Sequence, residues 1–182
     1  MKGTLFVDYV RMLRSQKGTD WAKHLRPEDI DYLVQRVQPD SWYPMESFER
    51  MGLAILAELS PDLETIRAWG RAQVDWLCRI HGDLVASGDA RDTLMRFRVL
   101  RASFFDYEAL TFAELTDGDA TLFISYGMSD RAEEAASWQT LGFFERLLEV
   151  AGATKVRVWF DKRSWATGER TCVRIQWEGA RH

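Results

Sequence analysis

Apolar and polar residues alternate with a helical period through the first 108 residues of the chain. Apolar side chains recur every three or four positions, the pattern of amphipathic helices that bury one face. Start and stop signals predict helices from Met1 to about Gly18, from Pro27 to Val37, from Pro44 to Leu59, from Pro61 to His81 and from Leu94 to about Tyr107. Ser60 is expected to cap the helix that begins at Pro61.

After residue 108 the apolar period changes from about four to two, which indicates strands. The expected strands are Leu110 to Leu115, Thr121 to Tyr126, residues 156–160 and residues 171–177. Between the second and third strands lies one more helical stretch, from Asp130 to Gly152. The order strand, strand, helix, strand, strand predicts an α+β fold, in which an N-terminal helical half is followed by a four-stranded antiparallel sheet with one face against apolar helices.

The length and composition indicate an ordinary globular protein, with 46% hydrophobic and 29% charged residues. We expect a single domain over 1–182, with a helical part in 1–108 and a sheet-plus-helix part in 109–182. The net charge of -4 argues against nucleic-acid binding, and no apolar run approaches the roughly 18 residues that suggest a membrane span. Cys78 and Cys172 show no metal-site spacing, so we expect a cytoplasmic protein with reduced thiols.

Gly142 lies inside the last expected helix, where a glycine costs roughly 1 kcal/mol relative to alanine. A ring, a ligand or another backbone that approaches closely would explain it. Tight packing of the helix on the sheet is the simpler alternative. At the start of the same helix, Asp130 and Glu133 have the spacing of an aspartate capping box.

Three polar residues leave the second strand together: Tyr126, Ser129 and Arg131. They offer a phenol, a hydroxyl and a planar five-donor cation within one turn, a set that suits a carboxylate or a phosphate. Helix capping and a surface salt bridge explain them equally well.

Little else in the sequence points to chemistry. The histidines are His24, His81 and His182, and His81 lies three residues after Cys78, so the two could offer a metal or a heme iron a pair of ligands. Two unrelated helix residues are the alternative. The carboxylates Glu133, Glu134, Asp89 and Asp92 are expected to be solvated or capping. No catalytic constellation appears, so we expect no enzyme.

The pieces together resemble the H-NOX family of heme, nitric oxide and oxygen binding domains. The resemblance rests on Met1-Lys2-Gly3-Thr4, the first amphipathic helix, Trp69-Gly70-Arg71, the strand-Tyr-Ser-Arg-helix order with Gly142, and the final hairpin. It covers nearly the whole chain. It implies a histidine ligand to heme iron on the helix before the sheet, and a Tyr-x-Ser-x-Arg motif that binds the heme propionates.

The chain departs from that family pattern at the iron ligand. Arg101 stands at or near the histidine's place, and no histidine lies between Gly82 and Arg181. Arginine stays protonated and offers no lone pair to iron. The spacing of Tyr126, Ser129 and Arg131 is one residue longer than the motif, and the family's proline near the start of the sheet is absent. The resemblance therefore implies a divergent member without the usual proximal histidine, in which heme binding would need His81.

We therefore expect a cytoplasmic H-NOX-like sensor or ligand-binding module, of the bacterial regulatory type, that signals to a separate partner protein. Its ligand would be a small apolar or acidic molecule, with Arg101 or Arg131 pairing an acidic group. The expected site residues are Tyr126, Ser129, Arg131, Arg101 and Gly142. Vinyl-reductase-like and Golgi-transport domains of the same superfamily resemble this fold without heme. Two alternatives stay open: a heme-free scaffold or adaptor, such as a homodimer, and a heme-based gas sensor with His81 as iron ligand.

Overall fold

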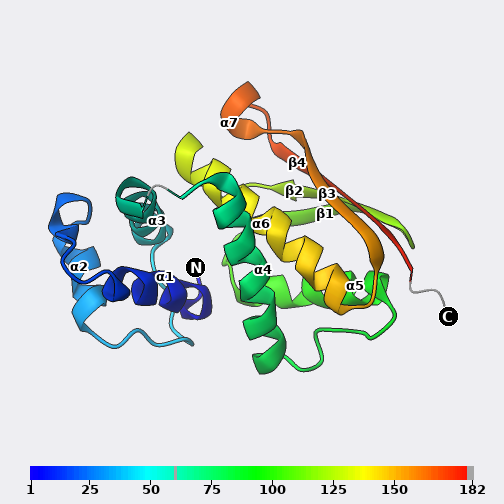
Figure 1. Cartoon of the computed structure of the whole chain (residues 1–182), viewed down its shortest axis with the longest axis horizontal. Helices are drawn as coiled ribbons and strands as arrows, with labels where there is room; N and C mark the ends of the chain where they lie inside the picture. The colour runs from blue at the N-terminus through cyan, green and yellow to red at the C-terminus, as the bar shows by residue number, and fades with distance from the viewer. Residues whose placement is uncertain (60, 180–182) are drawn as a thin grey trace. The chain divides into compact units, whose positions relative to one another are not determined.

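The computed structural model describes residues 1–59 and 61–179 of the chain. The expected cap Ser60 and the terminal His182 lie outside the described residues. Within them the fold is α+β, as predicted, with helices first and then a sheet that lies along one side of a long helix (Figure 1). The chain divides into two compact units: one of Met1–Pro61 and Ser103–Asp106, the other of Asp62–Ala102 and the described residues from Tyr107 onward.

The first unit is helical. Its elements are α1 (Gly3–Ser15), η1 (Trp21–Lys23), α2 (Pro27–Val34) and α3 (Met45–Leu59). Phe6, Leu13 and Met51 are fully buried and form its core. The ring of Phe6 stacks on Tyr43 at 4.5 Å and meets Tyr32 edge-on at 5.1 Å, so the aromatic residues fix how α1 lies against the loop that follows α2.

A buried ion pair joins α2 to α3 in this unit. Asp29 is fully buried and accepts hydrogen bonds from Nε and Nη2 of Arg50 at 2.6 and 2.8 Å, and from the backbone N–H of Arg26. Burial alone would raise the pKa of Asp29. The hydrogen bonds from Arg50, Ser47 and Arg26 outweigh that effect, so the pKa of this carboxyl lies below its ordinary value.

The second unit contains the sheet and its helices. The helices are α4 (Leu63–Ile80), α5 (Ala90–Leu100), η2 (Arg101–Ser103), of which the last residue belongs to the first unit, α6 (Asp130–Val150) and α7 (Ser164–Thr167). The strands are β1 (Leu110–Leu115), β2 (Asp119–Ile124), β3 (Thr154–Lys162) and β4 (Thr171–Glu178). They form an antiparallel sheet in the order β1-β2-β4-β3.

Several expected boundaries were wrong. Helix α4 begins at Leu63 rather than Pro61, because Asp62 is its N-cap and accepts a hydrogen bond from the backbone N–H of Thr65 at 2.6 Å. Helix α5 ends at Leu100, well short of Tyr107. The change from helix to strand falls near residue 108 as expected, but the compact units do not divide there, since α4 and α5 belong with the sheet.

Helix α6 packs on the inner face of the sheet and also against α4 (Figure 1). Leu141, Phe144, Leu147 and Leu148 are almost completely buried, as the wide apolar face of this helix predicted. From the strands, alternate residues such as Leu122, paired with Val173, form the opposite side of the core. None of the helices in residues 1–59 and 61–179 combines the length and apolar character that crossing a lipid bilayer requires.

Candidate functional site

The phenol of Tyr126 is engaged inside the protein. Strand β2 ends at Ile124, so Tyr126 begins the turn that leads to α6 and is 9% exposed. Its hydroxyl lies 2.6 Å from Oγ1 of Thr140 on α6. The Thr140 hydroxyl donates to the carbonyl of Ala136, so Tyr126 must be the donor to Thr140. The one proton of this phenol is therefore already used within the fold.

Glu133 stabilises the turn between β2 and α6 with its carboxylate. This carboxylate is 6% exposed and accepts the backbone N–H groups of Tyr126 at 3.0 Å and of Met128 at 3.1 Å, on either side of Gly127 with its φ of 74°. The expectation that Glu133 is solvated or pairs with Asp130 in a capping box was wrong. Ser129 is the N-cap residue, without a side-chain cap bond, and Glu133 turns back to the preceding loop. The two backbone donors compensate the burial of the Glu133 carboxylate, so this residue holds the turn in place.

A third side chain holds the same turn. The hydroxyl of Tyr107 donates to the backbone carbonyl of Tyr126 at 3.0 Å. In contrast, Ser129 and Arg131 lie at the start of α6 with exposed side chains. The structure therefore separates the three predicted residues: Tyr126 faces the interior, while Ser129 and Arg131 face solvent. Their role in ligand binding stays a prediction.

Arg101 follows α5 directly and is mostly buried, with its side chain 15% exposed. Its Nε is buried and has no hydrogen-bond partner. Its Nη2 lies 3.8 Å from Oε1 of Glu108, a carboxylate whose side chain is 76% exposed. Sequence analysis placed Arg101 inside a helix that runs to about Tyr107, which was wrong, because α5 ends at Leu100. It also could not show that the guanidinium is buried.

Gly142 has a neighbour that explains it without a ligand. A Cβ on this residue would lie 1.9 Å from the carbonyl oxygen of Arg67 on α4. Reciprocally, a Cβ on Gly70 would lie 1.8 Å from the carbonyl oxygen of Gln139 on α6. Two of the expected explanations for Gly142 can be compared with this contact. The close approach of another backbone is confirmed, whereas tight packing on the sheet was wrong, because the partner is helix α4. Contact of Gly142 with a ligand stays a prediction.

His81 is the C-cap residue of α4, half-buried, and its backbone N–H donates to the carbonyl of Leu77. Cys78 is also half-buried, and desolvation, followed by the charge of Asp75, raises the pKa of its thiol. Within the described residues, no three or more His, Cys, Asp or Glu side chains gather as they would around a metal ion. In the part of the chain that the structure describes, no third ligand side chain therefore joins Cys78 and His81 to form a metal site.

The interior beside α5 contains aromatic rings in mutual contact. Phe97 of α5 meets Phe143 at 5.0 Å and Phe144 at 5.2 Å between ring centroids, and Phe144 meets Phe112 of β1 at 5.8 Å. The many aromatic residues in the sequence thus form, at this place, a packed core between α5, α6 and the sheet.

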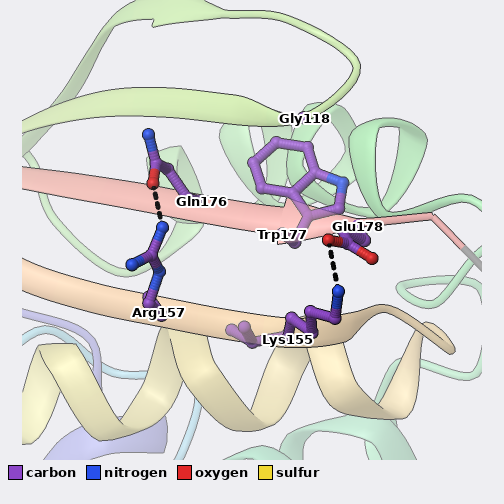
Figure 2. A pocket seen from close by; sticks show the side chains of 7 residues that line it. Gly118, Lys155, Arg157, Gln176, Trp177 and Glu178 are labelled. Atoms are coloured by element: carbon purple, nitrogen blue, oxygen red, sulfur yellow. Dashed lines mark hydrogen bonds and ion pairs between the residues drawn. The ribbon is translucent and has the colours of Figure 1, made fainter.

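A hollow of about 560 Å³ lies elsewhere, at the ends of β3 and β4 beside the β1–β2 turn. It is lined by Gly118, Lys155, Val156, Arg157, Gln176, Trp177 and Glu178. Nη2 of Arg157 donates to Oε1 of Gln176 at 2.9 Å, and Nζ of Lys155 donates to Oε1 of Glu178 at 2.8 Å. Dashed lines mark both contacts in Figure 2. Sequence analysis did not predict this hollow, which lies where the pairing of β3 with β4 is irregular between Thr154 and Arg157 and where Lys155 has a positive φ.

Comparison with known proteins identifies the fold. Neither a protein-family model nor the sequence of a curated protein matches the chain. Among solved structures, Fe(II) unliganded H-NOX from K. algicida matches with a TM-score of 0.71 at 14% identity, over 98% of this chain and 97% of that one. A point mutant of T. tengcongensis H-NOX matches with a TM-score of 0.66 at 17% identity, over all of both chains.

H-NOX from S. oneidensis, in its Fe(II)NO ligation state, matches with a TM-score of 0.66 at 12% identity, over 98% of this chain and 99% of that one. These likenesses confirm the predicted H-NOX-like fold along nearly the full length. At such low identity they establish the fold alone. What the chain binds must be argued from its own residues.

Two positions that the resemblance assigns to a heme, those of Arg101 and Tyr126, do not fit that group. Arg101 has no lone pair to offer iron, and the hydroxyl of Tyr126 is used by Thr140. His81 lies at the end of α4, outside the segment from α5 to the sheet where the resemblance puts the iron ligand. The site keeps one feature that suits an acidic group, the buried guanidinium of Arg101.

Proposed function

We propose that this chain is a sensor domain with the H-NOX fold that binds a small molecule in place of a histidine-ligated heme and signals to a separate protein. The observation that supports it most directly is the combination of a full-length H-NOX-like fold with Arg101, instead of a histidine, after α5. The proposal assigns no catalysis to the domain. It places the domain in the cytoplasm, which suits its two free cysteines.

The absence of iron ligation rests on the chemistry of the side chains at this place. A guanidinium stays protonated at any pH the fold survives and donates hydrogen bonds only. Among the described residues of this unit, His81 is the one that could offer iron an imidazole nitrogen. The loop 82–89 separates it in the chain from α5.

The test is reconstitution of the purified protein with hemin, followed by its absorption spectrum and native mass spectrometry. We expect no Soret band of a histidine-ligated heme, and a copurified small molecule in the native mass spectrum. The His81→Ala variant should behave like the wild type, and so should the control His24→Ala, whose ring is paired with Glu58. A firmly bound five-coordinate heme that is lost in His81→Ala would contradict the proposal and favour the heme-based gas sensor.

A heme-free scaffold or homodimer is the second candidate, and the packed rings of Phe97, Phe143 and Phe144 favour it, because they fill space that a ligand would need. On the outer side of α5, Met95 and Val99 are 38% and 77% exposed. A colourless dimer without any bound small molecule, which becomes monomeric in Val99→Ser, would support this candidate over the sensor. Light scattering after size-exclusion chromatography distinguishes the two.

A further inference from the structure

Arg101 differs from the other half-buried arginines of this fold in how its charge is compensated. Arg50 is 21% exposed and forms two short hydrogen bonds to Asp29. Arg67 is 26% exposed and binds both carboxylate oxygens of Glu145. Arg101 is more buried than either, at 15% exposed, yet its nearest carboxylate oxygen is 3.8 Å away on the exposed side chain of Glu108.

This difference has an energetic meaning. A buried cation that lacks a close counter-charge keeps most of the free-energy cost of its removal from water. The buried Nε–H of Arg101 adds an unmade hydrogen bond. The other buried polar atom without a partner among the described residues is Oγ of Ser137, a neutral hydroxyl that defines no ligand charge. The guanidinium therefore marks a place where the fold lacks an anion.

The geometry of the unmet donors selects the kind of anion. Nε–H and one Nη2–H point the same way along one edge of the planar guanidinium, and a carboxylate accepts such a pair with its two oxygens. In Arg101 the edge atoms are the unpartnered Nε and the Nη2 that stands 3.8 Å from Glu108. A carboxylate bound there would satisfy both atoms and neutralise the charge at once.

We propose that Arg101 is the anchor for the carboxylate of a small organic acid, an inference that rests on the proposed ligand-binding function. The acid is expected to have an apolar body, because Ala109 and Leu110, the buried residues of the same unit that follow Glu108, are apolar. Glu108 is exposed and can turn to solvent when the ligand carboxylate takes its place beside the guanidinium.

The test measures binding of benzoate, hexanoate and decanoate by isothermal titration calorimetry, with benzamide as the uncharged relative of benzoate and inorganic phosphate as the other anion. We expect at least one acid to bind the wild type, and Arg101→Gln to weaken it by about ten- to hundredfold, as the loss of a charged hydrogen-bonded pair does. Arg98→Gln, an exposed change on α5, and Arg157→Gln, in the hollow of Figure 2, should leave the affinity unchanged.

Several results would overturn the inference. These are binding of no acid, equal binding of benzoate and benzamide, binding of phosphate alone, undiminished binding in Arg101→Gln, or a loss in Arg157→Gln instead. If a neutral molecule copurifies with the protein, the inference fails and the sensor proposal stands. If native mass spectrometry finds no small molecule and no acid binds, both fail.

A second measurement does not depend on Arg101→Gln being well folded. Arg101→Met removes the uncompensated charge and keeps the bulk of the side chain, so we expect a higher midpoint of thermal unfolding than the wild type without ligand, and no further rise when the acid is added. A lower midpoint in Arg101→Met would mean that the guanidinium is a structural group, and would contradict the inference.

Discussion

The carbonyl oxygen of Arg67 on α4 occupies the space that a β-carbon on Gly142 of α6 would need, 1.9 Å from its ideal position. Two backbones meet here without side chains between them. Ion pairs between the same helices surround the contact, from Arg67 to Glu145 and from Arg71 to Glu149. The glycine is therefore required by its neighbour, and helix propensity would favour another residue.

Gly142→Ala should lower the free energy of unfolding by about 2 kcal/mol or more. The added methyl group meets backbone, which cannot rotate away, so the overpacking cost exceeds the gain of about 1 kcal/mol in helix propensity. Gly52→Ala in α3 is the control, because its Cβ would meet only Cε1 of Tyr9 at 3.4 Å. Chemical denaturation should show the control equal to or up to about 1 kcal/mol more stable than the wild type. Equal stability of Gly142→Ala would refute the contact.

Glu133→Gln should destabilise the turn before α6. The amide that replaces one carboxylate oxygen cannot accept a hydrogen bond through its NH2 group, so the N–H of Tyr126 or of Met128 loses its partner at a cost of about 1–3 kcal/mol. Hydrogen exchange at these two amides should quicken along with the loss of stability. The neighbouring change Glu134→Gln should leave both measurements unaltered, and equal effects of the two changes would contradict the assignment.

Tyr126→Phe and Thr140→Val should be coupled. Each removes one side of the 2.6 Å hydrogen bond between the two hydroxyls, worth about 0.5–1.5 kcal/mol. In a double-mutant cycle the double variant should therefore be less destabilised than the sum of the single ones, by about that amount. Strict additivity would show that the two hydroxyls do not stabilise each other, and would contradict this prediction.

The acid stability of the first unit should depend on Asp29. Its pKa is lower in the folded than in the unfolded protein, so the stabilisation is present above the ordinary aspartate pKa of 3.8 and is lost as the pH falls through the lower folded value. Asp29→Asn should cost about 3 kcal/mol near neutral pH, because Arg50 loses its buried partner and keeps the exposed carboxylate of Glu28, 3.7 Å away, as counter-charge. It should also remove this part of the acid transition.

The control for Asp29 is Asp31→Asn, an exposed change on the same helix α2. Unfolding by urea at a series of pH values should give curves for Asp31→Asn that follow the wild type throughout. If Asp29→Asn keeps the full acid transition of the wild type, the pair with Arg50 does not produce it.

The parts of the fold that follow from local pattern could be predicted. Alternation of apolar residues located the strands, and the three- and four-residue spacing located α6 with its buried face. Helix α5 was expected to continue to Tyr107 because Phe104 and Phe105 keep the helical spacing. Instead the carbonyl of Phe104 accepts the backbone N–H of Lys2 at 2.8 Å, a contact far along the chain that no local pattern contains.

The site was harder to foresee for a related reason. Glu133 and Glu134 look alike in the sequence, and only the turn of the chain at Gly127 brings backbone donors to the first of them. A guanidinium such as that of Arg101 is ordinarily exposed, so its burial depends on tertiary packing. Gly142 did indicate that another group approaches α6 closely. The partner, Arg67, lies 75 positions earlier in the chain, so the sequence could not identify it.

The short segment Ser103–Asp106 makes the chain pass between its two compact units three times, and it begins two residues after Arg101. A fragment cut at Pro61 would contain the amide of Lys2 but not the carbonyl of Phe104 that it binds, so it would lack part of the first unit. The same covalent path is a mechanical linkage. Arg101 and the first residue of that segment are separated by Ala102, so the backbone beside the buried guanidinium is one residue from a crossing between the units.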